Sequence, residues 1–480
     1  MKKLSILIAL VLLVSMSSFA LASGPRTTGF QIQNLGDGDA EVYIYYYNTD
    51  GSPASMDGPV TIGVGESRNW YQGLDGCIGA LPGSWQGSAV IESTQPVAVI
   101  ANIAEGGDYA AGAYVGTSGT TAGAPLILPA IMSGAGYFGF TTDFAIQNAG
   151  ADTAACTLEF YQTGEATPDK TVPSFNVEVG ASYYRNQETQ DADLGANWLG
   201  VVIADCNQPM AGTINQKPLG GAAGALLTYD AVAADKIPTG DISLPVIMWN
   251  FFDFWTGLQL IATDAAGAAG TISIYDSSGV LAHSEPFTLG QYGSHVLVPD
   301  LVGGSFSGTA DELYSAAIEF TSGAGTAMVN QRNMAGAIGM TYSGIYGANM
   351  TEGLSIPFGA RNYYGVSTGF QVVNTGAAGD IMVYYDGSPG SGSVSTTVGP
   401  ISLGAGDAVP LQQFLVGGDD PDLQGCTTCG SAGTGNRWYG SIRVVGDAGM
   451  SLSAIVNERG FDQSVVGDVG QVYNAFNYVP

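Results

Sequence analysis

The stretch TGFQIQNLG at residues 28–36 returns as TDFAIQNAG at 142–150 and as TGFQVVNTG at 368–376, with a weaker version, TGLQL, at 256–260. The Phe or Leu at its third position recurs at intervals of 114, 114 and 112 residues. Such regular spacing within a 480-residue chain indicates tandem repeats. The sequence therefore predicts four units, each opened by this stretch.

Each unit consists of short runs of alternating apolar and polar residues, separated by turns rich in Gly, Asp and Asn. In the first unit the turns Asp37-Gly38 and Asp50-Gly51 are the clearest, because Gly tolerates the positive φ that such turns require. Alternation with frequent turns is typical of sandwiches. We expect an all-β protein of four tandem Ig-like antiparallel β-sandwich repeats. The expected strands of the first unit are 30–34, 41–47, 60–64, 68–71, 88–93 and 97–102.

An apolar-Pro element precedes the later copies of the opening stretch, at Leu128-Pro129, Leu244-Pro245 and Ile356-Pro357. Proline suits the end of a strand, because it cannot donate to a central ladder. The terminal Tyr478-Val479-Pro480 is taken as a fourth copy of this element. The first unit has only residues 23–28 ahead of its opening strand. The expected domains are residues 23–129, 130–245, 246–357 and 358–480.

Residues 1–22 have the features of a secretory signal peptide. Lys2 and Lys3 precede an apolar run over residues 4–14, and Ala20-Leu21-Ala22 has the form of a signal peptidase site. The apolar run is too short to span a bilayer, and later residues contain no clean 18-residue apolar stretch. We expect a secreted protein, located outside the cell or at its surface, with no transmembrane anchor.

The mature chain is strongly acidic. Without Lys2 and Lys3, 11 of the 13 basic residues face 42 acidic ones. Such a surface repels phosphate backbones, which argues against nucleic acid as a partner. Only 11% of residues are charged while 45% are apolar, so the chain can bury real cores.

A second motif lies in the later half of the repeat, where Trp85, Trp198 and Trp438 each enter a strand and are followed two residues later by Gly. A Trp in this position fills a core more often than it stacks on a ligand. Together, the Gln-Asn-x-Gly and Trp-x-Gly motifs resemble the β-sandwich repeats of secreted bacterial surface proteins of uncharacterised function. The resemblance covers all four units, although the third lacks the Asn and the Trp. It implies an extracellular repeat protein.

Five cysteines in an exported chain indicate disulfides. Cys156 and Cys206 both have the strand parity of apolar neighbours, so we expect a bridge between the two sheets of the second unit. Cys426 and Cys429 lie in a Gly- and Asp-rich loop and are expected to form a local disulfide. Cys77 is left as a free thiol or a link to another chain.

No stretch carries a reaction signature, so we expect no enzyme and no catalytic residue. His283 and His295 are too few for a His-rich metal site. No cofactor is expected, although Asp419, Asp420 and Asp422 are weak candidates for structural calcium, since carboxylates on turns bind this ion.

A row of aromatic residues gives one candidate interaction surface. If Val42, Ile44 and Tyr46 face the core, the alternation turns Tyr43, Tyr45 and Tyr47 outward together. Contiguous exposed aromatics mark protein or glycan contacts. The alternative is that a linker or a neighbouring unit covers the row.

We expect a secreted structural subunit of a bacterial cell-surface filament, sheath or layer that self-associates into a homopolymer. The final strand, with Tyr478, Val479 and Pro480, would complete the first unit of the next molecule, or would close a compact ring within one chain. The alternatives are a monomeric rod acting as a spacer and an adhesin or glycan-binding module that uses the tyrosine row.

Overall fold

The computed structural model describes the chain apart from several loops and both ends. The described residues are 10–16, 26–71, 81–82, 85–105, 110–133, 139–219, 225–251, 253–297, 306, 308–309, 312–333, 338–361, 366–388, 393, 395–412, 438–460 and 470–478. Within them the strands form eight antiparallel sheets, four with five strands and four with four. The all-β prediction is confirmed.

The sheets come in pairs, and each pair encloses an apolar core in a unit of the sandwich type. In unit 1 the five-stranded sheet has the order β4 (Pro53–Ile62), β3 (Ala40–Asn48), β6 (Gly87–Ser93), β1 (Leu10–Met16) and β9 (Thr117–Ser118). Its four-stranded sheet has the order β5 (Ser67–Tyr71), β2 (Arg26–Asn34), β7 (Val97–Glu105) and β8 (Ala110–Val115). The core between them includes Phe30, Ile32, Val42, Ile44 and Val99, all nearly inaccessible.

Units 2, 3 and 4 repeat these two strand orders. Unit 2 has β13 (Lys170–Val177), β12 (Ala154–Gln162), β15 (Trp198–Cys206), β10 (Leu126–Ser133) and β18 (Val232–Ala233) against β14 (Ser182–Asn186), β11 (Phe140–Asn148), β16 (Met210–Pro218) and β17 (Leu227–Asp230). Unit 3 has β22 (Leu281–Leu289), β21 (Ala268–Tyr275), β24 (Glu312–Ser322), β19 (Ile242–Trp249) and β27 (Ile345–Tyr346) against β23 (Ser294–Leu297), β20 (Phe254–Ala262), β25 (Gly325–Asn333) and β26 (Gly339–Ser343). Unit 4 has β31 (Thr396–Leu403), β30 (Gly379–Gly387), β33 (Trp438–Gly446), β28 (Gly353–Arg361) and β36 (Phe476–Tyr478) against β32 (Ala408–Gln412), β29 (Val366–Asn374), β34 (Leu452–Gly460) and β35 (Gly470–Asn474). The short helices are α2 (Gln187–Gln190), η1 (Ala192–Leu194), η3 (Ala234–Lys236) and η4 (Gly347–Asn349).

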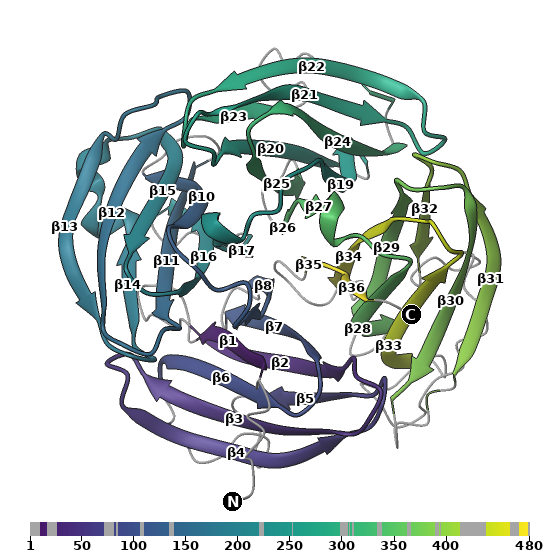
Figure 1. The fold of residues 1–480 in the computed structure, drawn as a ribbon, viewed down its shortest axis with the longest axis horizontal. Helices are drawn as coiled ribbons and strands as arrows, with labels where there is room; N and C mark the ends of the chain where they lie inside the picture. The colour runs from purple at the N-terminus through teal and green to yellow at the C-terminus, as the bar shows by residue number, and fades with distance from the viewer. Residues whose placement is uncertain are drawn as a thin grey trace, which may run out of the picture.

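The four units form a closed ring, as Figure 1 shows. Strands β4, β13, β22 and β31 run along its outer edge, and β8, β17, β26 and β35 meet around its centre, where each contacts the next. Every outer edge strand contains a proline, namely Pro59, Pro173, Pro286 and Pro400. Because proline cannot donate to a ladder, these edges resist pairing with another sheet.

The asparagine of the opening stretch links the two sheets of a unit by hydrogen bonds of its side chain. Asn148 Nδ2 donates to the carbonyl of Val177 on β13 (2.9 Å), and Asn148 Oδ1 accepts from Gly150 N (2.8 Å). Asn34 makes the same bonds, to Ile62 O and from Gly36 N. The asparagine therefore ends the opening strand and satisfies buried backbone groups of the other sheet, which explains its recurrence.

The Trp-x-Gly motif is structural. Trp198 and Trp438 are buried in their cores, and Trp85 is half-buried against its own. A Cβ at Gly200 would collide with the carbonyl of Tyr161 on the neighbouring strand and with the ring of Trp198. Only glycine allows the indole and the adjacent strand to pack this closely.

The structure corrects the expected domain boundaries. The positions 129/130, 245/246 and 357/358 fall inside β10, β19 and β28, each of which is the first strand of a new unit. Part of the predicted signal peptide, Leu10–Met16, forms β1 and occupies the corresponding place in unit 1.

The predicted equivalence of Tyr478-Val479-Pro480 with the apolar-Pro elements is also wrong. Tyr478 lies in β36, which pairs with β28 of its own unit through Tyr478 and Gly353. β36 thus corresponds to the short strands β9, β18 and β27. In this structure the C-terminal strand stays in unit 4.

The disulfide between Cys156 and Cys206 is confirmed, but its predicted location between sheets is not. The two residues face each other on the adjacent strands β12 and β15 of one sheet, with Cα atoms 4.1 Å apart. Strand parity correctly placed both side chains in the core, but it does not distinguish a neighbour in the same sheet from a partner across the core.

We predict that the double substitution Cys156→Ala with Cys206→Ala lowers the free energy of unfolding by about 4 kcal/mol, because the bridge closes a loop with a sequence separation of 50. Urea unfolding checks this value. Reductant should shift the wild type more than the variant, which keeps only the local bridge expected between Cys426 and Cys429. A wild-type midpoint that does not respond to complete reduction would contradict the prediction.

Candidate functional site

The contacts that join one unit to the next reuse the same two elements around the ring. A glutamine on the opening strand of one unit meets the backbone at the apolar-Pro element of the preceding unit. Gln371 Nε2 donates to Pro245 O (2.7 Å), and Gln31 Nε2 donates to Pro357 O (2.7 Å). Gln259 Oε1 instead accepts from the N–H of Ala130, the residue after Pro129 (2.6 Å). All three bonds are buried, so each leaves fewer unsatisfied groups at its interface.

A turn near the opening strand makes a second contact. Its positions Gly65, Gly180, Tyr292 and Gly406 all have positive φ, between 60° and 89°. Ser88 Oγ of unit 1 donates to Gly180 O of unit 2 (3.1 Å), and Ser441 Oγ of unit 4 donates to Gly65 O of unit 1 (3.2 Å). In unit 3 the ring of Tyr292 packs on Tyr161 of unit 2 at 5.6 Å.

The contact between units 1 and 2 differs in one respect. Ala145 stands where the other opening strands have glutamine. Gln147, two residues later, donates to Ser88 Oγ of unit 1 (2.7 Å) instead. This interface therefore lacks the bond between an opening-strand glutamine and the backbone at the apolar-Pro element, which the other three interfaces have.

Unit 4 contacts unit 1 through the same elements that join the earlier units. Gln31 and Ser441 both take part, and Ser355 Oγ donates to Gln33 Oε1 (2.6 Å). A head-to-tail contact whose rotation closes after four units gives a ring. The structure shows a ring within one chain, but the final strand does not close it as expected above, because β36 stays paired with β28 in unit 4. The extended rod is excluded.

A cavity of about 570 Å³ lies where the units meet, lined by residues of all four, including Tyr114, Asp230, Tyr342 and Asn474. Asp230 Oδ2 of unit 2 accepts from Val115 N of unit 1 (3.1 Å), while its Oδ1 is inaccessible and has no hydrogen-bond partner. Burial raises the pKa of Asp230 to about 8, although the bond from Val115 lowers it. Burial therefore favours the protonated form of this carboxyl group.

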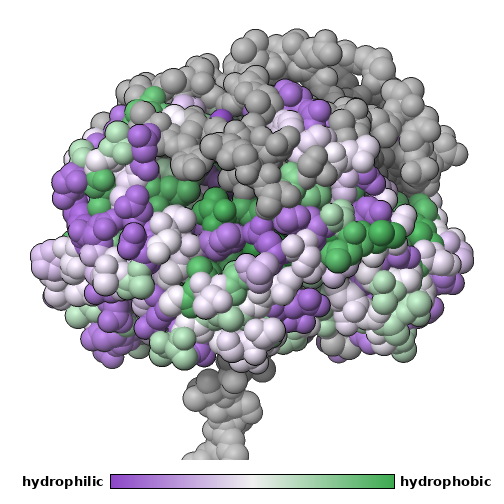
Figure 2. All heavy atoms as spheres, turned by 90° about the horizontal axis from the view of Figure 1, so that it is seen from above, coloured by the Kyte–Doolittle hydropathy of each residue, from purple (hydrophilic) through white to green (hydrophobic). Residues whose placement is uncertain are grey.

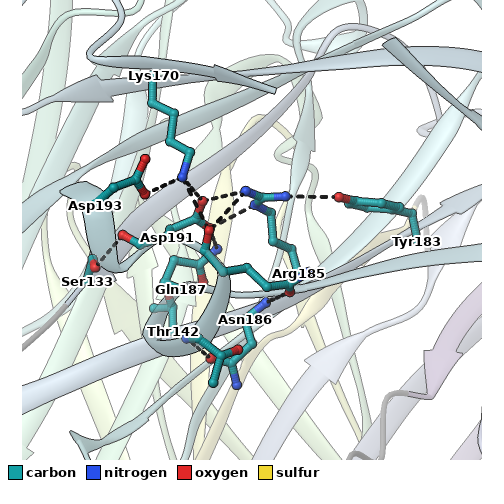
Figure 3. A network of polar contacts seen from close by, with 11 residues as sticks. Ser133, Thr142, Lys170, Tyr183, Arg185, Asn186, Gln187, Asp191 and Asp193 are labelled. Carbon is teal, nitrogen blue, oxygen red and sulfur yellow. Dashed lines mark hydrogen bonds and ion pairs between the residues drawn. The ribbon is translucent and has the colours of Figure 1, made fainter. Parts of the chain in front are cut away.

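A buried network of charges lies in unit 2, shown in Figure 3. Asp191 is inaccessible and accepts from Arg185 Nε (2.8 Å) and, through its other oxygen, from Arg185 Nη2. Lys170 Nζ reaches Asp191 (2.8 Å) and Asp193. Burial alone would lower the pKa of Arg185, but its hydrogen bonds with Asp191 raise it overall. Arg185 also lies over the Phe160 ring at 5.6 Å.

The network continues toward the opening strand. Thr142 Oγ1 donates to Gln187 Oε1 (2.8 Å), and Ser133 Oγ donates to Asp191 O (3.1 Å). Asp143 pairs with Lys217 Nζ (2.8 Å) close by. These charged and hydroxyl groups are paired with one another, so the network links several elements of unit 2 and has a structural role.

Sequence reasoning missed this network. Its residues are spread over several elements that only the fold brings together. One signal was present, since Asp143 replaces the Gly of the other opening stretches.

The tyrosine row lies as the alternation predicts. Val42, Ile44 and Tyr46 are buried, and Tyr43, Tyr45 and Tyr47 point to the other face, where each is half-buried. Tyr47 packs beside Gly180 of unit 2, so a neighbouring unit covers this end of the row. Tyr45 pairs across the strands with Met56, which is 52% exposed. The accessible part of the row is therefore Tyr43 and Tyr45 with Met56.

The two histidines meet at one carboxylate. Glu285 Oε1 lies 2.7 Å from His295 Nε2, and its Oε2 lies 3.4 Å from His283 Nε2. The described residues contain no cluster of three or more His, Cys, Asp or Glu side chains suited to a metal. This cluster joins β22 to β23 and so links the two sheets of unit 3.

Several predicted site residues lie outside the described residues, so the structure places none of them. They are Cys77, Asp419, Asp420, Asp422, Cys426, Cys429, Val479 and Pro480.

Comparisons with known proteins give no family. No protein-family model and no curated protein matches the chain. A chain of the broad bean stain virus structure is 12% identical over 47% of this chain and 92% of its own, with a TM-score of 0.12. The pilus backbone protein RrgB of Streptococcus pneumoniae is 8% identical over 79% of this chain and 86% of its own, also with a TM-score of 0.12. Neither likeness supports an argument. Among the described residues, no helix is long and apolar enough to cross a membrane.

We predict that Arg185→Ala lowers the free energy of unfolding by about 3–5 kcal/mol, because it leaves part of the buried Asp191 charge unpaired. Lys170→Ala is the matched control. Its side chain is more exposed, at 18% against 8% for Arg185, so the loss should be smaller. Urea unfolding of both variants checks the order, and a larger loss in Lys170→Ala would contradict it.

Glu458 on β34 yields a pH prediction. It is 3% exposed, its Oε1 has no hydrogen-bond partner, and burial raises its pKa to about 8. The folded state thus holds this proton more tightly than the unfolded state, whose pKa is near 4.5. The free energy of unfolding should therefore fall as pH rises from about 4.5 to about 8.

We predict that Glu458→Gln removes the part of this loss that Glu458 causes and leaves the part from Asp230, since Gln216 and Gln331 occupy the place of Glu458 in units 2 and 3. Thermal melts should show equal stability of variant and wild type near pH 4.5, and a more stable variant above pH 8. The reverse change, Gln216→Glu, should create the pH dependence in unit 2. Parallel pH profiles of wild type and Glu458→Gln would refute this account.

Proposed function

We propose that the protein is an exported structural subunit of a bacterial cell-surface assembly such as a filament, sheath or surface layer. The observation that supports this most is the ring itself, which one chain closes through buried contacts, two of which, Gln31 with Pro357 and Gln371 with Pro245, are of the same type. Such closure yields a rigid particle of fixed shape, which is what a repeated building block requires.

The described interior supports a structural role rather than chemistry. In the largest buried network, the two cations Arg185 and Lys170 are balanced by the two carboxylates Asp191 and Asp193. The acidic composition and the disulfide fit an exported protein.

The ring changes how subunits would join. Each of the four units contacts the preceding and the following unit within the same chain, and β36 pairs with β28. A polymer joined by the C-terminal strand does not fit this pairing. Figure 2 shows hydrophilic and hydrophobic residues interspersed along the side of the ring seen there, and the described rim exposes Met56, Val179 and Leu281. Assembly would use the rim or the faces of the ring.

The test is to locate the native protein and to measure its assembly. We expect immunogold labelling on the cell surface, and negative-stain images of isolated cell-wall material with ring-sized repeats that the antibody decorates. Deletion of the gene should remove these arrays. A protein found only inside the cell, or surface arrays unchanged by the deletion, would overturn the proposal.

An adhesin is the second candidate, favoured by the half-buried Tyr43 and Tyr45 beside the exposed Met56. Its test is glycan-array binding of the wild type and Tyr45→Ala. The matched control is Tyr384→Ala, because Tyr384 has the same place in unit 4 but lies under Arg443 at 5.3 Å. Binding lost only in Tyr45→Ala would favour the adhesin, and absence of binding by the wild type would remove it.

A further inference from the structure

Unit 1 differs from the others in the origin of its first strand. β1 pairs with β6 over seven residues, from Leu10 with Ser93 to Met16 with Gly87, and thereby fills the place of β10, β19 and β28. It lies within residues 1–22, which carry the pattern of a cleavable signal. Cleavage after Ala22 would remove β1 and open the edge of β6. We call the place of β1 the strand slot.

The strands that fill this place in the other units share a bulge at their proline. The register of β10 shifts between Leu128 and Ile131, that of β19 between Leu244 and Ile247, and that of β28 between Ile356 and Gly359. β1 contains no proline and pairs without a shift. The segment 10–16 is therefore a poorer match to this place than the three other strands.

A buried tyrosine in each of these units recognises the bulge. The hydroxyl of Tyr229 donates to Ala130 O (3.1 Å), that of Tyr342 to Val246 O (2.6 Å) and that of Tyr473 to Phe358 O (2.6 Å). The acceptor is always the residue that follows the proline. The tyrosine satisfies the carbonyl that the bulge withdraws from the ladder.

A buried threonine on the opening strand recognises the next part of the segment. Thr142 Oγ1 accepts from Met132 N (3.1 Å), Thr256 from Met248 N (2.7 Å) and Thr368 from Ala360 N (2.9 Å). Each donor is the third residue after the proline. Three units thus bind the same pattern with the same two side chains.

Unit 1 retains both side chains. Tyr114 pairs with Ala101 as Tyr229 pairs with Ile214, and Thr28 precedes Phe30 as Thr142 precedes Phe144. Tyr114 is 3% exposed and Thr28 is 2% exposed. The slot therefore has the residues that hold a proline bulge, although β1 does not supply one.

We propose that removal of residues 1–22 opens the strand slot and that an extended segment of a second exported polypeptide fills it. The segment pairs with β6 and carries apolar residues and a proline in the arrangement of LILPAIMS. Its carbonyl after the proline accepts from Tyr114, and its third N–H after the proline donates to Thr28. Such strand addition gives affinity through a ladder of backbone bonds. This inference rests on the proposed export.

The described part of the chain has no spare segment of this kind. β10, β19 and β28 each complete their own units, and β36 is paired with β28. The outer edges β4, β13, β22 and β31 each carry a proline, so the edge of β6 is the sheet edge that cleavage would leave open for pairing. These observations favour a separate polypeptide over a second copy.

The test uses the mature chain, residues 23–480, and a labelled peptide with the sequence of residues 125–133, PLILPAIMS. Fluorescence anisotropy should show saturable binding at one peptide per chain. A peptide with alanine at both prolines should bind at least several-fold more weakly. The uncleaved chain, residues 1–480, should bind less peptide because β1 competes.

Variants assign the binding to the slot. Tyr114→Phe should lower the affinity for the peptide by about 3–10-fold, which is the effect of losing one hydrogen bond. Thr28→Val provides a second variant in case Tyr114→Phe fails to fold, and Tyr229→Phe, the same change in unit 2, should leave the affinity unchanged. The proposal is overturned if the mature chain binds no peptide. It is also overturned if Tyr114→Phe and Thr28→Val bind the peptide as tightly as the wild type does and the peptide with alanine at both prolines binds equally well.

Two further outcomes separate this inference from the export proposal. Amino-terminal analysis of the exported protein that shows residues 1–22 retained would overturn the slot while leaving surface assembly standing. Mature chains that associate without peptide and are dissociated by it would place a second copy in the slot, which overturns the choice of a separate polypeptide.

Discussion

The structure depends on the need to satisfy the backbone at the proline bulge that opens units 2, 3 and 4. The bulge withdraws backbone groups from the ladder inside a buried sheet, where an unpaired group costs free energy. A tyrosine of the same unit takes one carbonyl, as Tyr342 does with Val246. A glutamine of the next unit takes another in two of the three cases, as Gln371 does with Pro245. Folding of a unit and docking of its neighbour thus satisfy the same few residues.

This coupling explains how the ring closes and which of its interfaces differs from the others. Gln31 of unit 1 binds the proline bulge of unit 4, and this contact closes the ring. The contact between units 1 and 2 lies beside the only first strand without a bulge, and there Ala145 replaces the glutamine. The ring therefore has one interface that differs from the other three at both of its positions.

Local patterns in the sequence predicted the all-β class and the buried faces of strands. The interval from Phe30 to Phe144 is visible in the sequence itself, and the alternation from Tyr43 to Tyr47 depends only on neighbours along one strand, so both could be read directly. The pairing of Cys156 with Cys206 followed from parity for the same reason. Properties that require the relative position of strands could not be predicted. These include the sheet that holds the disulfide, the ring closure and the contact of Arg185 with Asp191.

The central claim is that one chain closes a ring, and small-angle X-ray scattering of the mature chain tests it most directly. A compact particle of this length should have a radius of gyration of about 23 Å, whereas four sandwiches in a row would give about 40 Å. We expect the smaller value and a distance distribution with a single symmetric maximum. A radius near 40 Å with a long tail in the distribution would contradict the ring.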